Sequence, residues 1–296
     1  MDHKALADVL GVLVVGEALV DVVGRDDGEP AEHPGGSPLN VAVGLARLGV
    51  ASTLATQLGD DGYGDLVHEH LLASDVEIDD LSPTPERTST AVAALGIDGA
   101  AVYEFDLTWN PDSLPDPDGF AALHVGSLGS VLAPGARLVT QIVARAHAVG
   151  VPVSFDANVR LTVEPDAARW REVFDTLAPA ATVLRMSQDD VDVLFPGHGA
   201  TALAAELASE RRLVAITQGP DGAVLAAADH VVAVEAPSVD VVDTIGAGDS
   251  FTAALLAGLA TRGWATASTL SADDLRDLGT QAAHAAALTC TRPGAT

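Results

Sequence analysis

Lysine is almost absent from this chain of 296 residues: Lys4 is the only one, and every other formal positive charge belongs to an arginine. A standard Walker A phosphate loop requires a lysine directly after a glycine, and Lys4 has no such neighbour. The sequence therefore excludes that loop. Any phosphate site in this chain must rely on backbone dipoles, a metal ion and arginine.

Cysteine and long apolar runs are also scarce. Cys290 is the single cysteine, so no disulfide forms within the chain and we expect a reducing compartment. No apolar run approaches the roughly 20 residues of a membrane span. The first residues include Asp2 and Asp8 and lack the basic and long apolar regions of a signal peptide, so we expect a cytoplasmic protein.

Basic residues are few compared with acidic ones. The chain has 15 basic and 42 acidic residues, which give a formal net charge of −27. This balance argues against a nucleic-acid partner and against an anionic membrane surface. Aromatic residues make up only 4% of the chain, whereas hydrophobic residues make up 48%. A core of Ala, Val and Leu is therefore expected, which suits buried parallel strands under alanine-rich helices.

Strand-like runs alternate with helix-like segments in the second half of the chain. The strand-like runs are residues 122–125, 151–155, 182–184 and 213–217. This rhythm predicts βαβ units, and thus one α/β domain over residues 1–296 with helices on both faces of a mostly parallel sheet. Ligands of such sheets bind at the carboxyl ends of the strands. Asp156, Ser187, Gly219 and Asp249 follow predicted strand ends.

The first half predicts a different arrangement. Residues 11–18 read as a buried strand, residues 20–23 as a second strand and residues 40–48 as a helix stopped by Gly49. Residues 88–96 and 100–107 are β-rich runs joined by Ile97-Asp98-Gly99, which predicts a hairpin.

The segment VVDTIGAGDSF (residues 241–251) places a small-residue turn and a carboxylate at the start of an apolar helix. Helix N-termini attract phosphate, and Gly246 and Gly248 allow a ligand to approach the backbone. Asp249 would then accept a proton from an attacking hydroxyl, which indicates phosphoryl transfer. The alternative interpretation is an ordinary strand-to-helix turn with Asp249 as the N-terminal cap.

This segment resembles the carboxy-terminal signature of the PfkB, or ribokinase-like, family of carbohydrate kinases. The family's other signature is matched by GGSPLN, followed by VAVGLARLG, and three further motifs occur in the family's order. These segments are residues 35–49, 59–64 (GDDGYG), 153–160 (VSFDANVR) and 216–223 (ITQGPDGA). The resemblance implies a three-layer αβα fold. It also implies a small β-sheet lid, formed by residues of about 17–33 and 88–108, that covers the sugar.

The resemblance further implies an ATP-dependent sugar kinase in which Asp249 takes the proton of the sugar hydroxyl. Main-chain N–H groups of Gly246, Ala247 and Gly248 would hold the transferred phosphoryl group. The combination of GEALVD (residues 16–21), GGSPLN and VSFDANVR is most similar to bacterial fructokinases. Ribokinases and 2-keto-3-deoxygluconate kinases share much of it.

Asp21, Gly36 and Asn40 match sugar-binding positions of the family. Asn40 has the alternative of a plain helix cap, and Asp21 that of a solvated carboxylate at a strand end. Arg160 is a candidate for the phosphate or the sugar because guanidinium groups suit oxyanions, although surface arginines are common. Tyr103 and Phe105 would either cover the apolar face of the sugar or pack within the lid. These side chains form the predicted sugar site.

The nucleotide is expected along ITQGPDGA and against the last predicted helix, which covers residues 273–290. The residues concerned are Ser187, Thr217, Gly219, Gly222, Gly248 and His284. An ordinary β-turn is the alternative for the GPDG segment, residues 219–222.

Magnesium is expected to be held mainly by phosphates and water. Many relatives carry an Asn-x-x-Glu motif where this chain has Ser187-Gln188-Asp189-Asp190, so Asp190 keeps the carboxylate with a shorter reach. Family members often bind a monovalent cation such as K⁺, here through carbonyls near Asp243 and Ile245.

Other interpretations are weaker. GHGATA (residues 197–202) fits a loose dinucleotide fingerprint without the βαβ context that it needs. Gly248-Asp249-Ser250 matches the nucleophile block of GDSL hydrolases at the wrong end of the chain. A sugar-binding regulator without turnover is the rival from another class. Lid strands of relatives often pair between subunits, so we expect a homodimer through the lid.

Overall fold

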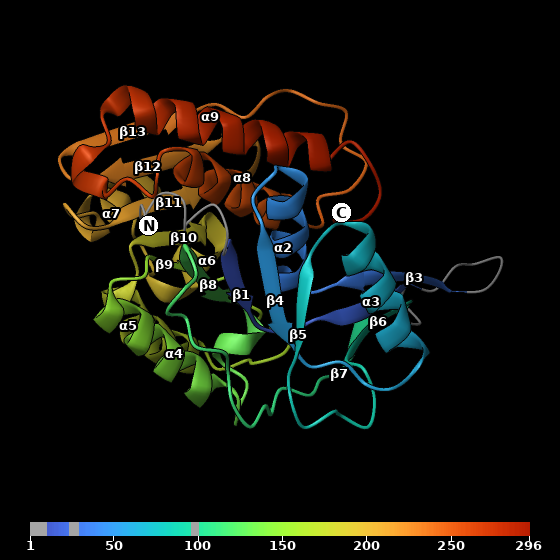
Figure 1. Ribbon diagram of the computed structural model, residues 1–296. Coiled ribbons are helices and arrows are strands. Elements are labelled where there is room, and N and C mark those ends of the chain that lie inside the picture. Colours follow the sequence, from blue (N-terminus) through green and yellow to red (C-terminus); the bar gives the residue numbers. More distant parts are fainter. Residues whose placement is uncertain (1–10, 24–29, 96–100) are drawn as a thin grey trace.

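A computed structural model describes residues 11–23, 30–95 and 101–296 of the chain. Its larger sheet has nine strands in the order β13-β12-β11-β10-β9-β8-β1-β4-β5 (Figure 1). These strands are β1 (Val12–Val15), β4 (Ser52–Thr56), β5 (Glu77–Asp80), β8 (Ala122–Gly126), β9 (Val153–Asp156), β10 (Val183–Ser187), β11 (Leu213–Thr217), β12 (Ala223–Ala227) and β13 (His230–Val234). Neighbouring strands are parallel except where β12 pairs with β11 and β13.

Helices cover both faces of this sheet. They are α2 (Ser37–Arg47), α3 (Gly62–Ala73), α4 (Ala136–Val149), α5 (Ala167–Leu177), α6 (Gln188–Leu194), α7 (Ala200–Leu207), α8 (Ala247–Thr261) and α9 (Ala272–Thr289). Short 3-10 turns are η1 (Leu128–Ser130), η2 (Ala178–Ala180), η3 (Gly219–Asp221) and η4 (Ala267–Thr269). The predicted alternation of strands and helices is confirmed.

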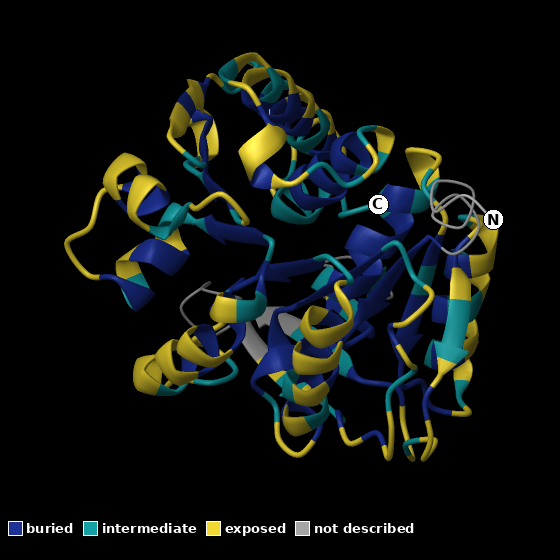
Figure 2. Cartoon of the chain, turned by 60° about the vertical axis from the view of Figure 1, so that its left-hand side comes forward, coloured by how far each residue is buried: buried dark blue, intermediate teal, exposed yellow. Residues whose placement is uncertain are grey.

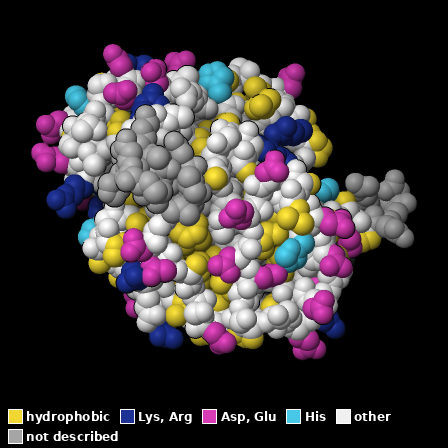
Figure 3. All heavy atoms as spheres, viewed as in Figure 1, with side chains coloured by type: hydrophobic (Ala, Val, Ile, Leu, Met, Phe, Trp, Pro, Cys, Tyr) yellow, Lys and Arg dark blue, Asp and Glu magenta, His cyan; other side chains and the backbone are white. Residues whose placement is uncertain are grey.

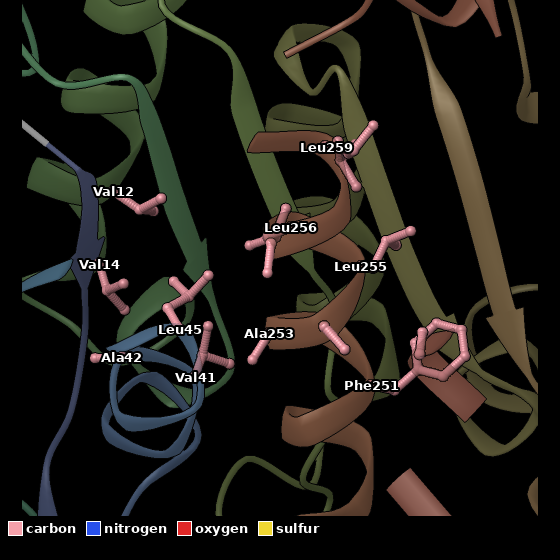
Figure 4. Close-up of a cluster of buried hydrophobic side chains, with 14 of the residues drawn as sticks. Val12, Val14, Val41, Ala42, Leu45, Phe251, Ala253, Leu255, Leu256 and Leu259 are labelled. Atoms are coloured by element: carbon pink, nitrogen blue, oxygen red, sulfur yellow. The ribbon is translucent and has the colours of Figure 1, made fainter. Parts of the chain in front are cut away.

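The core lies in two layers, one on each side of the sheet. Val12 and Val14 of β1 pack in a cluster with α2, α8 and α9 (Figure 4). Leu13 and Val15 face the opposite way, into a cluster with α4, α5, α6 and α7. All four residues are at most 1% exposed, because successive strand side chains point to opposite faces and both faces are covered. Figure 2 shows the central strands buried beneath the helices, whereas the edge strands β5 and β13 are partly exposed.

A second, four-stranded sheet lies to one side of the first, beyond α3 (Figure 1). Its order is β3-β2-β6-β7, and its strands are β2 (Leu19–Val23), β3 (Ala31–Gly35), β6 (Thr90–Leu95) and β7 (Ala101–Asp106). The predicted hairpin corresponds to the antiparallel pair β6–β7, and its turn at residues 97–99 lies outside the described residues. We call this sheet the lid.

Two element boundaries differ from the prediction. The strand predicted over residues 11–18 ends at Val15, because Gly16 takes a φ of 156° that turns the chain towards the lid. The helix predicted from Asn40 begins at Ser37, since Pro38 is well tolerated in a first helical turn.

Acidic side chains spread over the face seen in Figure 3, with few basic ones between them, as the net charge of −27 requires. Within the described ranges, no helix is both long and apolar enough to cross a membrane.

Candidate active site

The site lies where the carboxyl ends of the parallel strands meet the first turns of α2 and α8. Strands β1, β9, β10 and β11 all run in one direction, so their last residues share one edge of the sheet. The first turns of α2 and α8 are joined by hydrogen bonds between their side chains. Helix N-termini carry unpaired N–H groups, which makes this edge attractive to anions.

Helix α8 begins with a left-handed turn. Gly246 is its N-cap with φ 75°, and a Cβ at this position would lie 2.4 Å from the Cβ of Ala295. The Ser250 N–H donates to the Gly246 carbonyl, the first bond of the i to i−4 pattern. By helix geometry, the N–H groups of Gly248 and Asp249 precede that pattern and have no partner within the helix. These donors form the candidate anion-binding turn.

Asp249 is the third residue of α8 rather than its cap. Ser37 Oγ donates to Asp249 Oδ1 at 2.6 Å, and Asn40 Nδ2 donates to Asp249 Oδ2 at 2.8 Å. The interpretation of Asp249 as an N-terminal cap is therefore wrong, because Gly246 holds that position and no side chain caps the helix. Ser37 was not singled out from the sequence, although its place in GGSPLN, one helical turn before Asn40, is a signal that could have found it.

Asn40 lies inside α2 and is 7% exposed. The interpretation of Asn40 as a helix cap is therefore wrong as well. Its Oδ1 atom is buried and finds no hydrogen-bond partner within the described part of the chain, while its Nδ2 donates to Asp249. A buried acceptor of this kind is costly unless a donor reaches it, which a ligand hydroxyl can do.

Gly36 precedes α2 with φ 103°, and a Cβ there would lie 2.7 Å from the Glu17 carbonyl oxygen. Only glycine fits this close approach between the end of β1 and the start of α2. The Glu17 side chain is buried and accepts from the Gly129 N–H at 2.7 Å. Burial raises the pKa of Glu17 to about 7, against the lowering effect of the N–H donors around it.

Asp21 faces this region from the lid. Strand register places His33, Asp21, Ala91 and Phe105 in one row across β3, β2, β6 and β7, and cross-strand partners share a face. Burial raises the pKa of Asp21 to about 6, although His33 acts in the opposite direction. Asp21 is thus half-buried, and the alternative of a solvated strand-end carboxylate is not favoured. Tyr103 also lies on β7, but its side chain is outside the part of the chain that the structure describes.

Arg185 is a buried cation at this edge that sequence reasoning missed. It is 4% exposed on β10, its Nη1 lies 3.2 Å from both carboxylate oxygens of Asp156, and its Nη2 donates to Thr217 Oγ1 at 2.8 Å. Burial alone would lower the pKa of Arg185, but Asp156, Asp190 and Asp249 raise it overall. Burial raises the pKa of Asp156 to about 6, opposed by Arg185. The sequence feature that could have identified Arg185 is an arginine within an apolar strand, because a buried arginine is almost always paired with an acidic group.

Arg160, the arginine that the sequence suggested, is exposed. Its Nη1 donates to the neighbouring Val159 carbonyl at 3.1 Å. The structure therefore brings Arg185, and not Arg160, into contact with the residues around α8. The role predicted for Arg160 stays a prediction.

Asp190 has a capping role in the structure. Its Oδ2 accepts from the Ser187 N–H and its Oδ1 from the Val159 N–H, both at 2.7 Å, and Ser187 caps α6 in return. Since both oxygens already accept backbone donors, this geometry does not favour direct metal ligation by Asp190. Within the described residues, no group of three or more His, Cys, Asp or Glu side chains could hold a metal ion.

The predicted nucleotide residues lie on two parts of the molecule. Thr217 ends β11, and the turn η3 that follows leads into antiparallel β12, so the GPDG segment is a hairpin turn. Gly222 has φ 91°, and a Cβ there would lie 2.0 Å from the Val234 carbonyl oxygen. His284 is exposed on α9 in an open groove of about 550 Å³, also lined by Leu48 of the α2 end. The nucleotide-binding roles stay predictions.

The loop before α8 is tied to the end of the chain. Asp243 accepts from the Ile245 N–H through Oδ1 and from the Gly294 N–H through Oδ2, both at 3.0 Å. The Val242 N–H donates to the Cys290 carbonyl at 2.8 Å. The predicted monovalent-cation residues thus belong to a loop held in a fixed shape beside the anion-binding turn.

Comparisons with known proteins identify the family. A model of the pfkB family carbohydrate kinases matches residues 10–296. Fructokinase from Klebsiella pneumoniae is 32% identical over 261 residues, covering 85% of this chain and 85% of that protein.

Solved structures show the same fold. A double mutant of fructokinase from Vibrio cholerae O395, in fructose, ADP and potassium ion bound form, has a TM-score of 0.80 at 26% identity and covers 96% of this chain and 93% of that one. An uncharacterized sugar kinase from Pyrococcus horikoshii in complex with ATP has a TM-score of 0.75 at 26% identity, covering 96% and 93%. The fold is ribokinase-like, and the chain belongs to the pfkB family of carbohydrate kinases.

Proposed function

We propose that this kinase transfers the γ-phosphate of ATP to a hydroxyl of fructose, with Asp249 as general base. The observation that carries the proposal is the Asp249 carboxylate in the first turn of α8, beside a buried Asn40 oxygen that lacks a donor. A polyol supplies the hydroxyl donors that such oxygens need. The first turn of α8 supplies N–H donors for the phosphoryl group.

The transfer is one displacement. The acceptor oxygen bonds to the γ-phosphorus, the bond to the ADP oxygen breaks, and the hydroxyl proton passes to Asp249. N–H groups of Gly246, Ala247 and Gly248 stabilise the charge that develops on the phosphoryl oxygens. The Gly248 N–H has no partner within the helix, whereas the Ala247 N–H donates to the Thr244 carbonyl at 3.2 Å and would have to exchange this partner. Closure of the lid over the sugar excludes water, which otherwise competes as acceptor.

The sugar binds between the lid and the end of β1. Asp21 and Asn40 accept its hydroxyls. Gly36 contributes to the sugar site through its backbone, which packs closely against the Glu17 carbonyl. Phe105 lies in the same row of the lid as Asp21, which supports a contact with the apolar face of the sugar. Tyr103 and Arg160 complete the proposed sugar site.

ATP binds along the carboxyl ends of β10 and β11. The residues proposed for it are Ser187, Thr217, Gly219, Gly222, Gly248 and His284. Magnesium, which neutralises phosphate charge, is held by phosphates and water, with Asp190 acting through water because both its oxygens accept N–H groups. Potassium binds carbonyls near Asp243 and Ile245, beside the anion-binding turn.

A coupled ADP-release assay over fructose, ribose, 2-keto-3-deoxygluconate, nucleosides and sugar phosphates tests the proposal. We expect the highest kcat/KM with fructose. A higher value with ribose or 2-keto-3-deoxygluconate would instead make the chain a ribokinase or a 2-keto-3-deoxygluconate kinase. Saturable sugar binding without turnover of any acceptor would favour a sugar-binding regulator of the same fold.

The lid is also the proposed dimer surface, because its outer strands β3 and β7 have backbone groups that can pair with a second copy. Light scattering at several concentrations measures the mass in solution. A single-chain mass at all concentrations would contradict the homodimer.

A further inference from the structure

Arg185 lies outside every sequence motif of the family described above, yet it occupies the centre of the site. The other residues of its strand are apolar up to Ser187, and Val183, Leu184 and Met186 are each at most 5% exposed. A guanidinium in such a strand has a large desolvation cost. A residue of this kind needs a compensating contact or a function.

The guanidinium touches the anion-binding turn from inside the molecule. A Cβ on Gly248 would lie 2.8 Å from Arg185 Nη2 and 3.2 Å from Nη1. The same group contacts Asp156 on β9 and Thr217 on β11, so it joins two strand ends to the start of α8. Its Nε is buried and has no hydrogen-bond partner among the residues that the structure describes.

The contact between Arg185 and the turn matters because of the negative charge around it. Asp156 and Asp249 are both carboxylates at a site that must receive phosphate. Arg160 is exposed, whereas Arg185 lies between Asp156 and Gly248 of the turn. In a buried setting, a cation next to the turn offsets that repulsion more strongly than it would in water.

We propose that Arg185 is a positioning residue for phosphoryl transfer: it supports the first turn of α8 and supplies there the positive charge that a Walker A lysine supplies elsewhere. The proposal rests on the proposed kinase function and deepens it. Arg185 acts through the α8 turn and favours the terminal phosphates of the nucleotide over its nucleoside part.

The alternative is a purely structural pair that ties β9 to β10. Such a pair would affect stability without distinguishing ATP from adenosine. Binding of the two ligands, measured by calorimetry, therefore separates the two roles without depending on turnover.

The main test uses the double variant Arg185→Met/Asp156→Asn, which removes both charges and leaves no unpaired buried carboxylate. We expect it to bind ATP at least about tenfold more weakly, the usual effect of losing a charge-assisted contact, and to bind adenosine as the wild type does. Turnover should fall by about 10²–10³, the usual effect of losing one donor that stabilises the transition state, with little change in the KM for the sugar.

Arg212→Met is the matched control. Arg212 is a half-buried guanidinium that donates to the Ala181, Leu207 and Pro179 carbonyls at the amino end of β11, the opposite edge of the sheet. Its loss should lower stability and leave the ratio of ATP affinity to adenosine affinity unchanged.

Equal loss of ATP and adenosine affinity in the double variant, or wild-type values for both, would overturn the proposal. If the double variant fails to fold, the same binding and kinetic measurements are made on Arg185→Lys. Lysine keeps the positive charge but lacks the planar fork that reaches Asp156, Thr217 and α8 together. Since lysine keeps the charge, we expect Arg185→Lys to retain a preference for ATP over adenosine. Loss of ATP and adenosine affinity by the same factor in Arg185→Lys would overturn the proposal. A wild type without turnover on any sugar refutes the proposed function separately, since the nucleotide-binding comparison still tests Arg185.

Discussion

Two hydrogen bonds from α2 fix the carboxylate of Asp249 at the start of α8. The donors Ser37 and Asn40 are three residues apart, so they lie on one face of α2 and hold both oxygens of one carboxylate. A general base needs such a fixed orientation, because proton transfer requires the acceptor hydroxyl within hydrogen-bond reach. The orientation of this carboxylate is therefore set by single side chains of a second helix.

Asp249→Asn tests the general base. We expect turnover to fall by about 10² or more, the usual size of general-base effects, while fold and sugar binding are retained because asparagine has nearly the same shape. Steady-state kinetics and sugar-binding calorimetry measure the two effects. Asp240→Asn, an exposed substitution in the loop that precedes α8, is the control. Wild-type turnover in Asp249→Asn would remove this residue from the role.

Glu17 makes stability depend on pH. Its pKa is raised by burial from 4.5 to about 7, so the folded chain keeps a proton that the unfolded chain releases between these pH values. The contribution of Glu17 is therefore full below pH 4.5 and is lost as the pH rises through 7. Glutamine does not titrate, so the free energy of unfolding of Glu17→Gln, relative to wild type, should rise by about 3 kcal/mol from pH 4.5 to 8.

Urea unfolding at several pH values measures this difference. Glu206→Gln, an exposed substitution on α7, should show no comparable change between pH 4.5 and 8. A Glu17→Gln difference that stays flat with pH would contradict the raised pKa.

At the scale of elements, glycine positions decide where α2 and α8 begin and where β1 ends. Sequence reasoning predicted the α8 turn correctly because its glycines, carboxylate and apolar run are all local signals. It placed the start of α2 three residues late, because the close packing of Gly36 against the Glu17 carbonyl is a contact between distant segments. A contact between distant segments also ends β1 before Gly16. A Cβ on Gly16 would lie 2.5 Å from Pro38 Cγ.

Gly246→Ala tests the turn as an element. An alanine at φ 75° costs about 1–2 kcal/mol, and its Cβ would also collide with Ala295, so both stability and turnover should fall. Thermal unfolding measures the loss of stability, and steady-state kinetics measures the loss of turnover. The control is Gly199→Ala at the N-cap of α7, where a Cβ meets nothing within 4 Å. Equal effects of the two substitutions would show that the left-handed turn has no special role.

At the scale of the whole molecule, the proposed sugar site lies between the lid and the large sheet. A ligand bound between them stabilises the folded chain, and at a concentration 100 times its Kd the gain is about 2.7 kcal/mol. We expect fructose to raise the unfolding temperature accordingly, in the wild type and in Asp249→Asn alike. Glycerol at the same concentration controls for solvent effects. No shift with fructose, alongside a shift with another sugar of the panel, would reassign the substrate.

The sequence by itself determined the α/β class, the lid hairpin, the kinase family and the glycine turn at the start of α8, because each depends on periodicity or on residues close together in the chain. Only the tertiary structure decided which side chains meet at the site. Arg185, Asp156 and Thr217 come from three strands, and Ser37 and Asp249 are 212 positions apart. Strand order and helix packing bring them together, and no local pattern encodes that order.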